Sequence, residues 1–184
     1  MMNKSEIRKQ VKIQKNQLTE IDKLKYSEKA LANLESLIEF QNSINIGLFH
    51  SLNDEVNTHS FIEKWSHSKN IFLPRIAGDK LEMVKYIRED DLNEGKFKIK
   101  EPSNKIVSEL KNLDIIIIPA VALSCTGQRI GRGKGYYDRL LNNSDILKIG
   151  LIYDFQLYPF FKSEQHDVPM DVIVTDKGIL YLNK

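Results

Sequence analysis

The chain has 184 residues, of which 41% are apolar and 28% are charged, and its formal net charge is +2. This composition is ordinary for a globular protein, and the length predicts a single domain over residues 1–184. A net charge this small does not by itself indicate a nucleic-acid-binding protein. The single cysteine, Cys125, excludes a disulfide within the chain.

Helices and strands alternate along most of the chain. An amphipathic helix is predicted over residues 4–18, and a longer helix should begin after Thr19 and end near Phe40. We expect its buried side to consist of Leu24, Leu31, Leu34, Leu37 and Ile38. The further elements, in chain order, are a strand over 44–49, a helix over 58–69, strands over 71–76 and 81–87, a loop over 90–104, a short helix over 103–110, a strand over 114–119, a helix ending at 141, and strands over 146–153, 171–175 and 179–182.

This alternation predicts an α/β fold, a three-layer Rossmann-like sandwich with a mostly parallel central sheet. Ligands of such sheets bind beyond the carboxyl ends of the strands. The N-terminus lacks the continuous apolar core of a signal peptide, and no run approaches the ~18 apolar residues of a membrane span. We therefore expect a cytoplasmic protein without a membrane partner.

A glycine-rich basic stretch over residues 128–139 reads Q-R-I-G-R-G-K-G-Y-Y-D-R. Glycines at alternate positions let backbone N–H groups approach a ligand, while arginine and lysine side chains bind phosphate oxygens. An aspartate follows, and its oxygens suit Mg²⁺. The stretch therefore predicts a site for a polyphosphate with its metal. It matches neither the Walker A pattern nor the dinucleotide fingerprint, and a mobile surface turn is the alternative interpretation.

The run R-I-G-R-G-K-G-Y-Y-D-R resembles the signature of the 5-formyltetrahydrofolate cyclo-ligases, also called methenyltetrahydrofolate synthetases. The resemblance implies that ATP and Mg²⁺ are used to convert 5-formyltetrahydrofolate to 5,10-methenyltetrahydrofolate, with release of ADP and phosphate. It implies catalytic roles for Arg132 and Lys134. The nucleotide would be held by this loop, at Arg129, Ile130, Gly131, Arg132, Gly133, Lys134, Gly135, Tyr136 and Tyr137, with Tyr136 also contacting the folate.

The basic stripe of the first helix has two interpretations. From charge alone, we would favour a solvated helix face. The resemblance implies instead that Lys4 and Arg8, which match a K-x-x-x-R pattern of the family, reach the nucleotide.

Two further segments are candidates for the same site. Glu55 lies in a loop after a predicted strand, where it either accepts hydrogen bonds from a pterin or begins the next helix. The family's E-[VI]-x-T pattern favours Glu55 as the folate ligand, with His50 as a weaker candidate. Asp167 either lies in a plain turn or shares a cation with Asp138. The family's P-x-E-x-H-D segment matches here at Glu164, His166 and Asp167, with Lys162 in place of the proline.

From the resemblance we predict a cyclo-ligase whose partners are small molecules, acting as a monomer or weak homodimer without nucleic acid. Whether His50, Phe155 or Tyr153 line the folate pocket stays open. One alternative is a non-catalytic binding module for a phosphorylated metabolite. Another is an RNA-binding protein, which we disfavour because only Tyr26 interleaves with the N-terminal basic residues.

Overall fold

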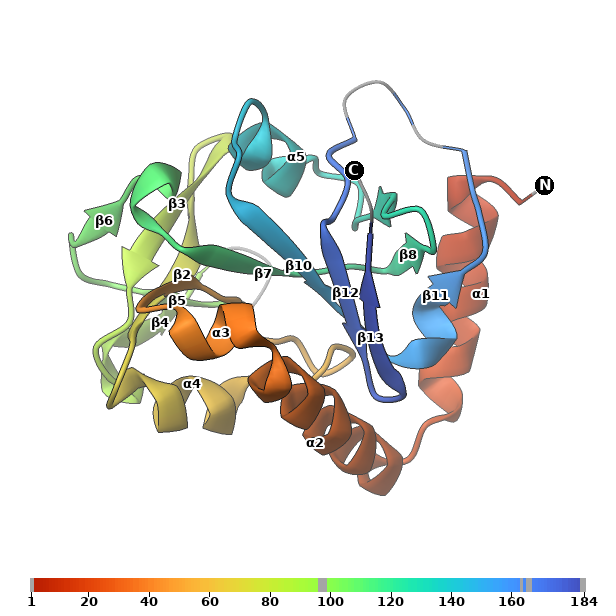
Figure 1. Cartoon of the computed structure of the whole chain (residues 1–184), viewed down its shortest axis with the longest axis horizontal. Helices are drawn as coiled ribbons and strands as arrows, with labels where there is room; N and C mark the ends of the chain where they lie inside the picture. The colour runs from red at the N-terminus through yellow and green to blue at the C-terminus, as the bar shows by residue number, and fades with distance from the viewer. Residues whose placement is uncertain (1, 96–98, 163, 165–166, 183–184) are drawn as a thin grey trace.

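An eight-stranded sheet in the order β13–β12–β10–β7–β1–β2–β3–β6 forms the centre of the computed structural model, which describes residues 2–95, 99–162, 164 and 167–182 (Figure 1). Its strands are β1 (Asn45–Gly47), β2 (Asn70–Ala77), β3 (Lys80–Lys85), β6 (Val107–Ser108), β7 (Ile115–Pro119), β10 (Leu147–Leu151), β12 (Val172–Thr175) and β13 (Gly178–Tyr181). The five central strands, from β12 to β2, pair in parallel, and the outer pairs are antiparallel. The predicted α/β fold with a mostly parallel sheet is confirmed.

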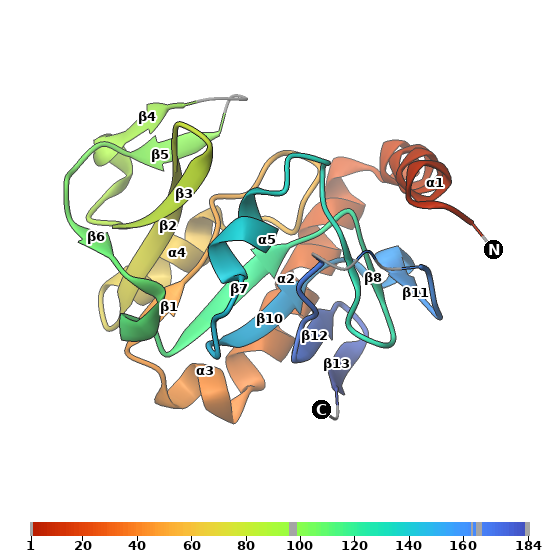
Figure 2. The same cartoon turned by 90° about the horizontal axis from the view of Figure 1, so that it is seen from above.

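Helices cover both faces of this sheet (Figure 2). They are α2 (Glu20–Ser36), α3 (Ile38–Asn42), α4 (His59–Ser66) and α5 (Tyr136–Leu141), whereas α1 (Lys4–Gln17) packs elsewhere. Side chains alternate between the faces of a strand, so Ile115 and Ile117 pack in the core under α2, α3 and α4, whereas Ile116 and Ile118 pack with Leu141 of α5. One apolar core therefore lies on each face of the sheet, between the sheet and the helices that cover it. Helices, sheet and helices are the three layers that the alternation predicts.

The first helix packs outside these layers, against a small sheet in the order β11–β8–β9 (Figure 2). Its strands are β8 (Ala122–Ser124), β9 (Arg129–Ile130) and β11 (Leu157–Tyr158). Ile7 and Val11 of α1 are buried against Ala122, Ile130 and Phe161. Since the glycine-rich loop leaves β9 directly, this packing brings α1 beside the loop.

The segment between β3 and β7 differs from the prediction. Residues 103–110 do not form a helix, because Val107 pairs with Val84 and extends the sheet as β6, before a 3₁₀ turn at Leu110–Asn112. Residues 90–104 are also not a plain loop. They contain the antiparallel pair β4 (Leu92–Glu94) and β5 (Lys100–Pro102), which follows a 3₁₀ turn at Glu89–Asp91.

The predicted second helix is interrupted at Leu37, whose backbone is extended while its side chain is buried. The expected burial of Leu24 and Ile38 is wrong, since they are 55% and 57% exposed. The predicted burial of Leu34 and Leu37 is confirmed, and the small side chains of Ser27 and Ala30 complete the buried face. No helix in the described part of the chain has the length and apolarity to span a bilayer.

Candidate functional site

A cavity of about 1470 Å³ lies beyond the carboxyl ends of β1, β2 and β7, where parallel sheets bind their ligands. The glycine-rich loop, the first turns of α1 and the loop after β1 all line it. The cavity brings together every residue predicted for the site: Lys4, Arg8, His50, Glu55, Arg129, Ile130, Gly131, Arg132, Gly133, Lys134, Gly135, Tyr136, Tyr137, Asp138 and Asp167. Tyr153 and Phe155 are not among its lining residues.

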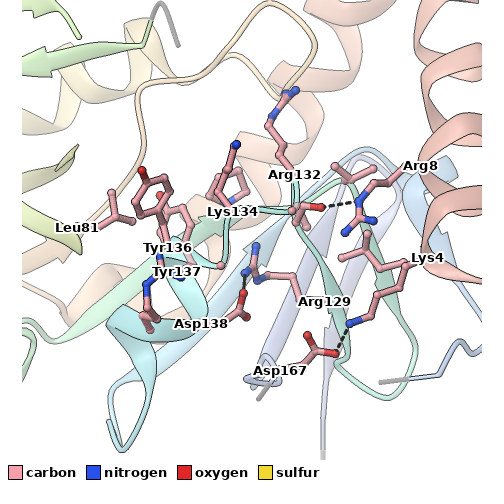
Figure 3. Close-up of a pocket in the computed structure, with 18 of the residues that line it drawn as sticks. Lys4, Arg8, Leu81, Arg129, Arg132, Lys134, Tyr136, Tyr137, Asp138 and Asp167 are labelled. Atoms are coloured by element: carbon pink, nitrogen blue, oxygen red, sulfur yellow. Dashed lines mark hydrogen bonds and ion pairs between the residues drawn. The ribbon is translucent and has the colours of Figure 1, made fainter. Parts of the chain in front are cut away.

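The opposite end of the cavity was missed by sequence reasoning. It is apolar, with Pro74 and Ile76 from β2, Leu81 from β3 and Ile99 before β5, beside the carboxyl group of Glu101. Leu81 lies next to Tyr136 (Figure 3). No local pattern marks these residues, because they meet the loop only through the pairing of β2 with β3 and the packing of β5 against β2.

Two cationic side chains of α1 face the loop segments (Figure 3). Arg8 Nε donates to the carbonyl oxygen of Gly131 at 2.9 Å, and Lys4 Nζ pairs with Asp167 Oδ2 at 2.6 Å and Glu164 Oε1 at 3.3 Å. Asn3 caps the helix reciprocally with a glutamate in the first turn, which fixes where the helix begins. Since only 17% of the Lys4 side chain is exposed, the alternative of a solvated helix face is wrong for Lys4, although Lys12 of the same helix is exposed.

The glycines of the loop suit two different local geometries. Gly133 and Gly135 have φ angles of 93° and 66°, in the left-handed region that other L-residues rarely adopt. At Gly131, a Cβ atom would lie 2.8 Å from Nη1 of Arg129. The loop thus turns sharply at Gly133 and Gly135, and at Gly131 it packs closely against the Arg129 guanidinium.

Arg129 forms a buried ion pair with Asp138, at 2.8 Å between Nη2 and Oδ2. The Arg129 guanidinium also lies over the ring of Tyr137, with Cζ 5.6 Å from the ring centroid. Burial raises the pKa of the Tyr137 hydroxyl, which keeps this phenol protonated. Within the described chain, Arg129 Nε and Asp138 Oδ1 are buried without a hydrogen-bond partner. Each member of the pair therefore keeps unused hydrogen-bonding capacity beside the cavity.

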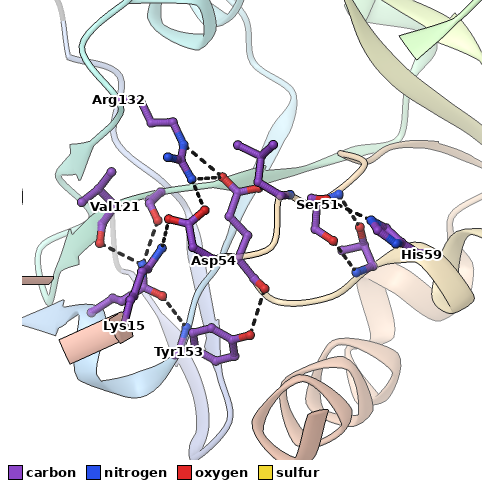
Figure 4. Close-up of polar contacts among 12 residues, drawn as sticks. Lys15, Ser51, Asp54, His59, Val121, Arg132 and Tyr153 are labelled. Atoms are coloured by element: carbon purple, nitrogen blue, oxygen red, sulfur yellow. Dashed lines mark hydrogen bonds and ion pairs between the residues drawn. The ribbon is translucent and has the colours of Figure 1, made fainter. Parts of the chain in front are cut away.

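The carboxylate of Glu55 contacts Arg132, which is labelled in Figure 4. Arg132 Nη2 lies 3.1 Å from Glu55 Oε1 and 2.5 Å from Asp54 Oδ1. Leu52 N–H donates to Glu55 Oε2 at 3.0 Å, and the Tyr153 hydroxyl donates to the Glu55 carbonyl oxygen at 2.9 Å. Tyr153 thus supports this loop from behind the cavity wall. The alternative that Glu55 begins the next helix is wrong, because α4 begins at His59.

His50 lines the cavity with 5% of its side chain exposed. Its ring stacks on that of His59, with the centroids 3.9 Å apart. Burial, followed by the neighbouring His59, lowers the pKa of His50 to about 4, against the opposing effect of Glu89. Its Nε2 atom has no hydrogen-bond partner in the described chain, since Glu89 Oε2 is 3.8 Å away. A neutral imidazole is therefore held beside the cavity.

Asp138 and Asp167 both reach the cavity wall, but each is paired with its own cation, Arg129 and Lys4. Among the described residues, no three His, Cys, Asp or Glu side chains gather as a metal site. Mg²⁺ commonly uses one or two carboxylates and takes its remaining ligands from phosphates and water. The unpartnered Oδ1 of Asp138 fits that role. His166 lies outside the described residues.

Comparison with known proteins shows similarity over nearly the whole chain. The sequence matches the 5-formyltetrahydrofolate cyclo-ligase family over residues 1–176. It is 29% identical over 181 residues to the 5-formyltetrahydrofolate cyclo-ligase of Haemophilus influenzae, covering 93% of this chain and 97% of that relative. The structure is similar to the 5,10-methenyltetrahydrofolate synthetase of Aquifex aeolicus, with a TM-score of 0.90, 34% identity and coverage of 100% of this chain and 94% of that chain. The synthetase of Mycoplasma pneumoniae is similar with a TM-score of 0.77, 25% identity and coverage of 95% and 99%.

Proposed function

Because the chain belongs to the 5-formyltetrahydrofolate cyclo-ligase family, we propose that it converts 5-formyltetrahydrofolate to 5,10-methenyltetrahydrofolate by forming a ring C–N bond. We further propose that it uses ATP and Mg²⁺ and releases ADP and phosphate. One observation carries this proposal. The same cavity is lined by a glycine-rich basic loop, suited to phosphates, and by the Glu55 carboxylate, suited to the N–H groups of a pterin.

The proposed reaction has two steps. The formyl oxygen of the folate is a poor leaving group, so the γ-phosphoryl group of ATP is first transferred to it, which breaks the bond to ADP and forms an iminium phosphate. N10 of the folate then attacks the formyl carbon, loses its proton, and the C–O bond breaks to release phosphate. Phosphoryl transfer requires in-line positioning and charge neutralisation more than a protein nucleophile, which suits a site rich in cations.

The glycine-rich loop would bind the triphosphate. Arg132 and Lys134 would neutralise the charge that develops during transfer, and Lys4 and Arg8 would close over the nucleotide from α1. The backbone and side chains that complete the phosphate site are those of Arg129, Ile130, Gly131, Gly133 and Gly135. Arg129 contributes while anchored to Asp138 at 2.8 Å, so it would offer the nitrogen atoms that this pair leaves unused.

The folate would lie on the other side of the two tyrosines. Tyr136 and Tyr137 are flat and line the cavity between the loop and its apolar end (Figure 3), a position that suits a ring stacked between nucleotide and folate. Glu55 would accept hydrogen bonds from the pterin edge, and the unpartnered Nε2 of His50 would add a donor or acceptor beside it. No general base is assigned among these residues.

Asp138 and Asp167 would hold Mg²⁺ together with phosphate oxygens. The support is the unpartnered, buried Oδ1 atom of Asp138 in the cavity wall. The ion would neutralise charge on the transferred phosphoryl group.

A direct assay tests the proposal. The purified full chain is mixed with 5-formyltetrahydrofolate, and the absorbance of the methenyl product is followed with and without ATP and Mg²⁺. We expect product only when both are present, together with one ADP per product molecule. If nucleotide binds but the folate stays unchanged, the protein is a binding module for phosphorylated metabolites and the proposed function is wrong.

A further inference from the structure

A chain of charges extends from the cavity to the buried face of α1. We call Lys15, Asp54, Arg132 and Glu55 the charge network (Figure 4). Lys15 Nζ lies 3.3 Å from Asp54 Oδ2, and Asp54 shares Arg132 with Glu55. Arg132 and Glu55 line the cavity, whereas Lys15 and Asp54 do not. The network therefore connects two groups that can touch substrates with two that cannot.

Lys15 is unusual for a lysine on a surface helix, because only 7% of its side chain is exposed. It continues the buried stripe of Ile7 and Val11 rather than the exposed side of α1. Burial lowers the pKa of Lys15, while the charges of Asp54 and Glu55 oppose that shift. Burying an ammonium group is costly unless it is paired. A packed apolar residue would suit this position better if stability alone mattered.

The two carboxylates of the charge network differ in the number of cationic side chains that contact them. Within the described chain, the contacts below 4.0 Å give Asp54 two cations, Lys15 and Arg132, but give Glu55 only Arg132. Burial raises the pKa of Asp54, but Lys15 and Arg132 outweigh it and hold this pKa below its usual range. If Arg132 turns toward a phosphate group, Asp54 keeps a counter-charge while Glu55 loses its own.

We propose that Lys15 is a positioning residue that couples the two substrates by allowing Arg132 to leave Asp54 for the phosphate. The release of Arg132 then leaves Glu55 as an open acceptor for the N–H edge of the pterin. Nucleotide binding therefore raises folate affinity, and linkage requires that folate raise nucleotide affinity by the same factor. This inference rests on the proposed function, because it needs both substrates in one cavity.

Calorimetry on the full chain tests the coupling. The affinity for 5-formyltetrahydrofolate is measured with and without a saturating non-hydrolysable ATP analogue and Mg²⁺. We expect the analogue to tighten folate binding in the wild type by at least about fivefold. In Lys15→Met, Asp54 retains Arg132, so the analogue should bind at least about fivefold more weakly and the coupling factor should fall toward one.

Two further variants separate positioning from simple stabilisation. Lys15→Met/Asp54→Asn removes the carboxylate that retains Arg132, so it should restore the coupling factor to the wild-type value. Lys12→Met changes an exposed lysine of the same helix and should leave both affinities unchanged. If Lys15→Met does not fold, Asp54→Asn alone should keep the coupling and bind the analogue at least as tightly as the wild type.

The outcomes distinguish this inference from the proposed function. Wild-type protein that binds both ligands without coupling overturns the role of Lys15 and leaves the function standing. The same holds if Lys15→Met lowers only the melting temperature, or if the double variant or Asp54→Asn loses the coupling. Wild-type protein that binds neither ligand defeats the proposed function itself.

Discussion

Arg8 and Gly131 are 123 positions apart in the sequence, yet Arg8 Nε donates to the Gly131 carbonyl oxygen at 2.9 Å. The contact orients one peptide of the glycine-rich loop from outside, through a helix that is otherwise packed on β8 and β9. A carbonyl held by Arg8 cannot turn toward the phosphate side of the loop. The first helix therefore helps to decide which way the backbone of the loop faces.

We expect Arg8→Met to weaken nucleotide binding. The variant loses both the contact with Gly131 and one charge near the phosphates, so the KM for ATP should rise by about tenfold or more, whereas kcat should change less. Steady-state kinetics at saturating folate measure this split. Lys9→Met, an exposed neighbour on the same helix, is the matched control. An unchanged KM for ATP in Arg8→Met would remove this residue from the nucleotide site.

Lys134 should matter for catalysis far more than for stability. Its side chain is exposed in the loop, and exposed substitutions usually change stability by about 0.5 kcal/mol or less. Lys134→Met should lower kcat by about a hundredfold or more, because a charge that neutralises the transferred phosphoryl group is lost. The assay is product formation under saturating ATP, with Lys29→Met on α2 as the control. A variant that retains its turnover would contradict the phosphate role.

Asp138→Asn tests the metal proposal. The amide cannot replace the carboxylate as a Mg²⁺ ligand, so the Mg²⁺ concentration for half-maximal activity should rise by about tenfold or more. The substitution also weakens the pair with Arg129, so thermal unfolding must be measured alongside. Asp145→Asn, at an exposed position beyond α5, controls for the loss of one negative charge. An identical metal titration in Asp138→Asn would exclude this residue from the metal site.

His50 should make folding stability depend on pH. Its pKa of about 4 lies below the ordinary value near 6.5, so the unfolded chain binds more protons between these two values. The contribution of the neutral His50 ring to the free energy of unfolding is thus fully present above pH ~6.5, and it is lost as the pH falls toward about 4. Across this pH window, we expect the free energy of unfolding to fall by on the order of 2 kcal/mol more in the wild type than in His50→Gln.

Urea unfolding at pH 7.5 and at pH 4.5 measures the difference. His67→Gln replaces a histidine that is 76% exposed at the end of α4, and it should follow the wild-type pH dependence. The assignment to His50 fails if His50→Gln loses as much stability on acidification as the wild type does.

Several features of the fold could be predicted because their signals are local. The run Ile115–Pro119 is apolar on both faces, which is typical of a central parallel strand. Thr19 and the acidic residue three positions later form a capping box that a short stretch of sequence already contains. In contrast, β6 has only two residues, and its existence depends on pairing with β3. No local pattern of that length distinguishes a strand from a loop.

In the candidate site too, some features have a local signal in the sequence and others depend on tertiary contacts. Its polar lining was predictable, because the glycine-rich motif and the loop after β1 are short segments at the carboxyl ends of parallel strands, whereas its apolar end was missed. The partners of its charged groups were not predictable. Lys15 is one of several basic residues on α1, yet it is buried against Asp54, which is 39 positions away.

The sequence alone was enough to predict the layered α/β architecture, the central strands and most helices, and the basic, glycine-rich part of the cavity lining. Hydrophobic periodicity and glycine placement act over a few neighbouring residues, so these features can be read along the chain. Only the tertiary structure decided that Arg132 contacts Asp54 and Glu55, and that Arg129 contacts Asp138. An ion pair forms between whichever charged groups the folded loops bring within a few ångströms, and that distance is a property of the packed molecule.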